Sequence, residues 1–173
     1  MDSVVIEPFR VRPGDDASCL NLYEPRNPRI LAPRDTFLME GRFAFRASLA
    51  STAAERANPW LLLRRQEPDG TIPVIADANS MTYVLKRQLG EEMVIAHNGR
   101  LVRLRFVAAL SDSIFQGELL MSETNFLKVF PEREGYQFFL AETAPDSSQP
   151  VAAAVEAALT DYGADARSPA DRL

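Results

Sequence analysis

The sequence predicts an α+β domain in which a mixed or antiparallel sheet carries helices packed on one side. Two observations predict this class. Short apolar runs bounded by glycine, proline or aspartate recur along the chain, as is typical of strands, and helical spacing appears only in short segments between them. The most informative stretch, residues 72–142, reads strand, helix, hairpin, short helix and strand. At 173 residues the chain is long enough for a single domain over 1–173, built as one compact unit or as two small lobes.

A hairpin is predicted between residues 91 and 110. Asn98-Gly99 separates two apolar runs, and this pair is a strong hairpin signal because a type I′ turn needs two residues that tolerate positive φ. The turn places Ile95 opposite Val102. The predicted register puts two arginines on one face and five apolar residues on the other: Arg103 and Arg105, then Val102, Leu104, Phe106, Ala108 and Leu110.

A helix is predicted between the strand at Ile72–Ala76 and this hairpin. Asp77 is placed to cap its first turn, and Gly90 is placed as the left-handed residue that follows its end. Between them, apolar residues recur at helical spacing and two cations occupy the last turn: Met81, Val84, Leu85 and Leu89, then Lys86 and Arg87.

The N-terminal part predicts one strand, a connector and two capped turns. Residues 3–12 alternate as a strand with Pro8 at an edge or bulge, and the prolines from 25 to 33 favour an extended connector. Thr52 to Glu55 fits a capping box, and Asn58-Pro59 begins a second helix. Residues 36–45 form a dense aromatic patch around Gly41.

The C-terminal part predicts two strands and two helices. A short strand at 118–121 precedes a helix that Ser122 caps and Pro131 ends. A strand follows at 135–142, with Tyr136, Phe138 and Leu140 facing inward. A last helix runs from Val151 to Tyr162, and residues 164–173 form a polar tail.

Composition excludes several classes. The net charge of -5 and the pI near 5.0 argue against a nucleic-acid partner, which would call for a basic face. No apolar run approaches the ~20 residues of a membrane span, and no leader follows Met1, so we expect the chain as given to be soluble. A single cysteine excludes an internal disulfide and the usual zinc clusters.

The candidate catalytic groups favour structural roles. Cys19 and His97 could form a nucleophilic pair, but Cys19 sits in an apolar run and His97 flanks the predicted hairpin turn. Asp15-Asp16 lacks the spaced ligands of a calcium loop. The carboxylate pairs Glu91-Glu92 and Glu118/Glu123 show no convergent polar set around them. We therefore predict no catalytic site, no cofactor and no metal.

The order of elements from Ile72 to Leu110 resembles the extracytoplasmic core domain of FtsX/MacB-type ABC transporter permeases. The resemblance rests on the capped helix, Leu89-Gly90, the strand after it, Asn98-Gly99 and the Val-Arg-Leu-Arg-Phe-Val run. Residues 14–23 and 113–126, with Phe130-Pro131, resemble a large-permease branch of the family. Residues 151–173 resemble the helix that leads towards the next membrane span. Ala108-Ala109 departs from the family, which often has glycine there.

The resemblance implies a porter-like lobe at the periplasmic face of the bacterial inner membrane. The implied partners are the membrane-spanning segments of the same permease, a cytoplasmic ATPase, and a periplasmic adaptor or lipoprotein substrate. The implied function is contact with substrate or adaptor, together with movement driven by ATP hydrolysis elsewhere. As part of a loop between two spans, residues 1–5 and 165–173 are expected at one end of the domain.

One loop is predicted to contact such a partner: Ser113, Ile114, Phe115, Gln116 and Gly117. It carries two apolar residues in a segment that otherwise reads as a loop, and loops on rigid scaffolds often carry recognition. Burial of both apolar residues in the core is the alternative. For the whole chain, the alternative function is a soluble ligand- or protein-binding module that uses residues 37–45 as an aromatic pocket. An enzyme with Cys19 as nucleophile ranks last.

Overall fold

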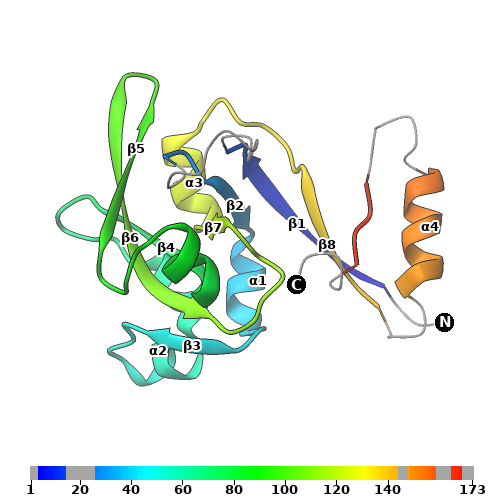
Figure 1. Cartoon of the computed structure of the whole chain (residues 1–173), viewed down its shortest axis with the longest axis horizontal. Helices are drawn as coiled ribbons and strands as arrows, with labels where there is room; N and C mark the ends of the chain where they lie inside the picture. The colour runs from blue at the N-terminus through cyan, green and yellow to red at the C-terminus, as the bar shows by residue number, and fades with distance from the viewer. Residues whose placement is uncertain (1–3, 15–25, 144–147, 159–164, 169–173) are drawn as a thin grey trace.

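The structure, a computed structural model, describes residues 4–14, 26–143, 148–158 and 165–168. These residues form an eight-stranded mixed sheet (Figure 1). Its strand order is β3-β6-β4-β7-β2-β1-β8, and β5 pairs with β6. The β2–β7 and β4–β6 pairs are parallel and the others antiparallel. The strands are β1 Val5–Arg12, β2 Arg29–Pro33, β3 Phe45–Ser48, β4 Ile72–Asp77, β5 Glu92–His97, β6 Arg100–Leu110, β7 Glu118–Leu120 and β8 Phe138–Glu142. The predicted α+β class with a mixed sheet is confirmed.

Helices cover both faces of the sheet, so the prediction that they pack on one side is wrong. The helical elements are α1 Asp35–Glu40, α2 Ala53–Ala57, the 3₁₀ turn η1 Pro59–Arg64, the π-helical turn η2 Ser80–Val84, α3 Glu123–Val129 and α4 Ser148–Ala158. Met81 of η2 and Phe126 of α3 pack on one face. Phe37 of α1 and Trp60 of η1 pack on the other. The central strands are apolar on both faces, and each face needs its own cover.

The predicted hairpin is confirmed as β5 and β6. Ile95 pairs with Val102 and Met93 with Leu104, which is the predicted register. Asn98 and Gly99 have φ values of 48° and 74°, as a type I′ turn requires.

The predicted sharing of one face along all of β6 is wrong beyond Phe106. Between β4 and β6 the register shifts, so that Val74 pairs with Phe106 while Ile75 pairs with Ala108. Val107 is the extra residue of a β-bulge, which reverses the alternation of side chains that follows it. As a result Ala108 packs with Leu110 in the core opposite to that of Phe106.

The helix after β4 is shorter than predicted. Asp77 does act as a cap, because its Oδ1 accepts a hydrogen bond of 3.0 Å from the Asn79 backbone. The π-helical turn then ends at Val84, and Lys86 takes a left-handed φ of 51°. Gly90, also left-handed at 84°, belongs to the turn before β5, where its N–H donates to the Phe106 carbonyl. The helical spacing of apolar residues in the sequence does not indicate that the helix ends at Val84.

In the N-terminal half, the predicted caps are confirmed and the predicted connector is not. The capping box of Thr52 with Glu55 and the Asn58 cap are confirmed. The predicted connector at Pro25 to Pro33 contains β2, a strand in the middle of the sheet that hydrogen-bonds to β1 and β7. The prolines do not prevent this strand, because Pro33 stands only at its last position.

The last helix, α4, has no fully buried side chain and lies beyond the β1–β8 end of the sheet (Figure 1). The predicted last helix is observed over residues 148–158; its predicted continuation to Tyr162 lies outside the described residues. The start of β1 and residues 165–168 lie at the same end of the long axis of the molecule. The remaining end residues are outside the described ranges, so the placement of both termini stays a prediction.

We predict that Gly99→Ala lowers the free energy of unfolding by about 1 kcal/mol, because a Cβ disfavours the left-handed conformation. A Cβ at this position would meet no neighbouring atom within 4 Å, so the cost is conformational. Urea unfolding measures it. The control is Asn98→Gly at the adjacent left-handed position, where we expect a change within about 0.5 kcal/mol; equal stability of Gly99→Ala and wild type would contradict the turn type.

Candidate functional site

The predicted contact loop, Ser113 to Gly117, is anchored to the start of η2. The Ser113 backbone N–H donates to Asp77 Oδ2 at 2.7 Å, and the Gly117 N–H donates to Ser80 Oγ at 2.7 Å. Asp77 and Ser80 are both buried. Two buried polar side chains, close together along the chain, therefore hold both ends of the loop.

The two apolar residues of the loop differ in burial. Phe115 is fully buried and its ring lies 5.8 Å from that of Phe9 and 5.3 Å from that of Phe43. Ile114 is only half-buried against the same core, and Gln116 is half-buried as well. Phe115 is thus a core anchor, and the accessible part of the loop is reduced to Ile114, Gln116 and Gly117.

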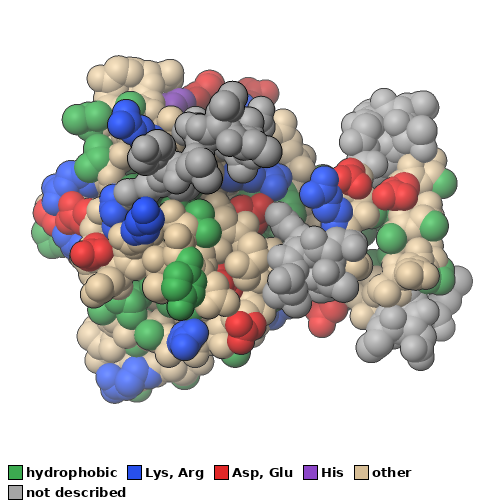
Figure 2. All heavy atoms as spheres, viewed as in Figure 1, with side chains coloured by type: hydrophobic (Ala, Val, Ile, Leu, Met, Phe, Trp, Pro, Cys, Tyr) green, Lys and Arg blue, Asp and Glu red, His purple; other side chains and the backbone are tan. Residues whose placement is uncertain are grey.

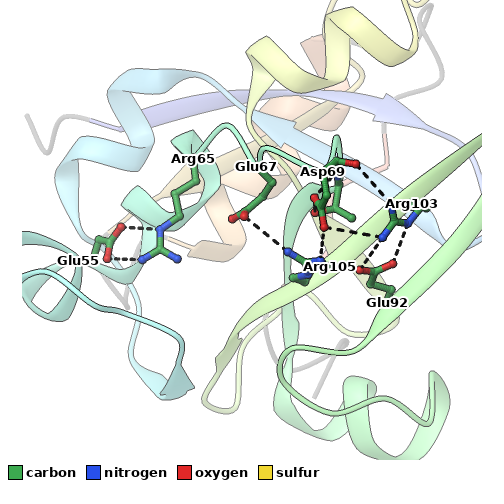
Figure 3. A network of polar contacts seen from close by, with 8 residues as sticks. Glu55, Arg65, Glu67, Asp69, Glu92, Arg103 and Arg105 are labelled. Carbon is green, nitrogen blue, oxygen red and sulfur yellow. Dashed lines mark hydrogen bonds and ion pairs between the residues drawn. The ribbon is translucent and has the colours of Figure 1, made fainter.

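A network of charged side chains lies at the base of the hairpin (Figure 3). Arg103 and Arg105, on the face that the register predicted, both bind Glu92 of β5, at 2.9 Å and 2.7 Å. Arg105 also binds Asp69 at 2.7 Å and Glu67 at 3.5 Å. The network joins β5 and β6 to the turn that precedes β4.

These contacts shift the pKa values of the carboxyl groups in one direction. Hydrogen bonds from the Thr71 hydroxyl and backbone, and then from Arg105, hold the pKa of Asp69 well below its ordinary value. Arg103, followed by Arg105, lowers the pKa of Glu92. Both carboxylates remain ionised at neutral pH and serve as acceptors for the arginines.

A separate ion pair closes the capping box of α2. Arg65 donates to Glu55 from two nitrogens, at 2.7 Å and 2.6 Å, and the Ser51 backbone donates at 2.9 Å. Arg65 first, and then Ser51, hold the pKa of Glu55 far below its ordinary value. This cluster supports the α2–η1 unit.

On the face seen in Figure 2, acidic and basic side chains are interspersed.

A cleft of about 650 Å³ lies between the hairpin, the end of α3 and the turn before β4. Its lining consists of Asp69, Gly70, Ile72, His97, Asn98, Arg100, Leu101, Val102, Arg103, Lys128, Val129 and Pro131. Sequence reasoning missed this cleft, because its three walls are far apart along the chain. The residues do not form a recognisable motif until the sheet brings them together.

His97 connects the hairpin to the segment after α3. Its Nε2 lies 2.8 Å from Glu132 Oε1, and its ring stands edge-on to Phe130 with centroids 4.6 Å apart. His97 flanks the hairpin turn, as predicted, but its side chain is packed rather than solvated. Its suggested partner, Cys19, lies outside the described residues, as do Asp15 and Asp16.

The candidate carboxylate pairs do not act as pairs. Glu91 accepts from the Gln88 backbone at 2.7 Å, whereas Glu92 belongs to the arginine network. Glu118 binds Arg29 at 2.9 Å.

Glu123 has partners of its own. It accepts from Arg10 at 2.7 Å and from the Tyr136 hydroxyl at 2.8 Å, and the hydrogen bond to Tyr136 raises the pKa of that tyrosine.

Within the described ranges, no three His, Cys, Asp or Glu side chains gather as metal ligands. None of the described helices is both long and apolar enough to cross a bilayer. That the chain is not an enzyme stays a prediction.

No protein-family model matches the sequence, and no curated protein matches it. Among solved structures, the chain is similar to the periplasmic region of MacB from Actinobacillus actinomycetemcomitans, with a TM-score of 0.44 and 12% identity over 91% of this chain and 67% of that one. It is also similar to the extracellular domain of the noncanonic ABC-type transporter YknZ from Gram-positive bacteria, with a TM-score of 0.41 and 12% identity over 95% and 76% of the two chains.

We predict that Asp77→Ala lowers the free energy of unfolding by about 3 kcal/mol, because it leaves the Ser113 and Asn79 amides without their charged acceptor. Urea unfolding at neutral pH measures the change. Glu134→Ala, at an exposed position, is the control and is expected to stay within about 0.5 kcal/mol of wild type. A similar small effect for both variants would refute the anchoring of the loop by Asp77.

Acid should weaken the arginine network. The pKa of Glu92 is lower in the folded chain than in the unfolded one, so its contribution to stability is present above the unfolded value of about 4.3 and is lost as pH falls through the folded value. Wild type is therefore expected to be more stable than Glu92→Gln at neutral pH, with the difference shrinking below about pH 4. Urea midpoints over this range test the sign; a difference independent of pH would contradict it.

Proposed function

We propose that the chain is the extracytoplasmic domain of an FtsX/MacB-like ABC transporter permease. The observation that carries the proposal is the unit from Ile72 to Leu110. Its residues carry the sequence resemblance, and they form the consecutive elements β4, η2, β5 and β6. The departure at Ala108-Ala109 falls just after the β-bulge, where both alanines are buried.

In this function the domain contacts a substrate or an adaptor protein outside the membrane and moves as the ATPase partner works in the cytoplasm. The partners are the spans of the same permease, that ATPase, and a periplasmic adaptor or lipoprotein. Such coupling requires contacts that differ between two states of the domain. The hairpin is suited to transmit a shift, because it is joined to the body by hydrogen-bonded strands and by the arginine network rather than by a flexible linker.

The accessible part of the predicted loop is kept as a proposed contact surface. Ile114 and Gln116 lie between two anchored ends, so a partner could meet them without ordering the loop first. Phe115 is excluded from that role by its burial.

The alternative, a soluble module with an aromatic pocket, is weakened by how the aromatic side chains pack. Phe37 and Trp60 are fully buried, with ring centroids 5.1 Å apart, and Phe43 lies 6.3 Å from Phe37. Phe37 and Trp60 fill the core with each other, and Phe43, which is 37% exposed, lies at the edge of that core.

The test uses the full-length natural protein in a bacterial host. Alkaline phosphatase inserted at Asn98-Gly99 is expected to be active, because it folds only outside the cytoplasm, and a matched insertion of green fluorescent protein is expected to stay dark. The protein should fractionate with the inner membrane. An inactive phosphatase, a fluorescent insertion and a cytosolic protein would together overturn the assignment.

The contact loop has a separate test in the same full-length protein. A photo-crosslinking residue at Ile114 is expected to yield an adduct with another protein of the cell envelope, whereas the same residue at exposed Arg46 on β3 should not. Absence of any adduct at position 114, with the protein correctly inserted, would contradict the role of the loop.

A further inference from the structure

The strand β6 has one edge without a partner beside the cleft. From Arg100 to Arg103 it pairs with β5 on one side, and on the other side β4 begins to pair only at Leu104. Among the described strands, none covers this edge. An open strand edge offers backbone N–H and C=O groups that pair readily with another extended segment.

The same cleft offers apolar contact. Leu101, next to the open edge, is 77% exposed, which is unusual for a leucine within a strand. Ile72, Val129 and Pro131 also line the cleft, where Ile72 and Val129 pack against the core on the sheet face opposite to Leu101. An exposed apolar residue beside an open strand edge is typical of a recognition surface.

Two cations at the cleft have no carboxylate partner among the described residues. Arg100 makes no ion pair there, and Lys128 donates only to the neutral amide of Gln66 at 3.0 Å. Arg103, in contrast, is held by Glu92. In a chain with a net charge of -5, a cleft that keeps two unpaired cations is complementary to an anionic ligand.

We propose that this cleft binds an extended acidic peptide segment of a partner protein, which adds a strand to the open edge of β6. The backbone pairs with residues 101–103, so that alternate side chains of the peptide point to opposite faces. Apolar side chains meet Leu101 on one face, and carboxylates lie near Arg100 and Lys128 on the other. Strand addition supplies affinity through main-chain hydrogen bonds, and the side-chain contacts supply selectivity. A volume of about 650 Å³ lies within the range of small binding sites.

The inference rests on the proposed function only for the origin of the peptide, a substrate or an adaptor outside the membrane. The cleft, the open edge and the unpaired cations are properties of this chain. A binding test on the purified chain is therefore distinguishable from the membrane-topology test, and either can fail alone.

The experiment measures fluorescence anisotropy of a short labelled peptide of alternating valine and glutamate, titrated with the full chain. Saturable binding is expected, with amide protection in hydrogen exchange appearing at Leu101 and Arg103, whose N–H groups point away from β5. The double variant Arg100→Glu/Lys128→Glu should weaken binding by at least about tenfold. The matched control Arg46→Glu, an exposed arginine outside the cleft, should bind as wild type does.

Two further probes separate strand addition from other modes of binding. A peptide with lysine in place of glutamate should not bind, and a peptide with alternate backbone nitrogens methylated should not bind although it keeps its charge and side chains. Equal binding of the methylated peptide would indicate capture of an anionic amphiphile and would overturn the proposal. So would an absence of binding at millimolar peptide, or equal loss of binding in Arg46→Glu.

Discussion

The strand β6 is the element on which the rest of the structure depends. It hydrogen-bonds to β5 and β3 along one edge and to β4 along the other. Its C-terminal half is buried on both faces, with Phe106 in one core and Leu110 in the other. The bulge at Val107 makes this possible, because an extra residue reverses which face each later side chain meets. A strand without the bulge would send Ala108 and Leu110 to the same core as Phe106.

A second constraint is the burial of polar anchors between elements. Asp77 ends β4, caps the turn after it and holds the amide of Ser113 across the molecule. A buried carboxylate is tolerated only when its oxygens are hydrogen-bonded, so its partners are fixed together with it. The loop that carries Phe115 into the core is therefore placed by a polar contact and secured by an aromatic one.

The hairpin and its surroundings combine rigidity with accessibility. Arginines on one face bind Glu92 and Asp69, and His97 at the other end packs on Phe130, so the hairpin is fixed at its base and near its tip. Between these two attachments the strand edge at Leu101 stays open. The proposed function, in which the domain relays movement while it holds a partner, calls for this combination, because a binding edge on a mobile loop would lose affinity to ordering.

The sequence by itself determined the local features. It specified the α+β class, the hairpin with its register, and the caps at Asp77 and Thr52, since each depends on residues within one or two turns of the chain. It could not determine features that depend on distant neighbours. The strand β2 looked like a connector because its status as a strand depends on β1 and β7. Helices were expected on one side because the burial of both faces of the central strands depends on helices that are distant in the sequence. The cleft and its open edge arise where β4 stops pairing short of Leu101 and α3 packs opposite. Only the tertiary structure decides that, because no short stretch of sequence contains both walls.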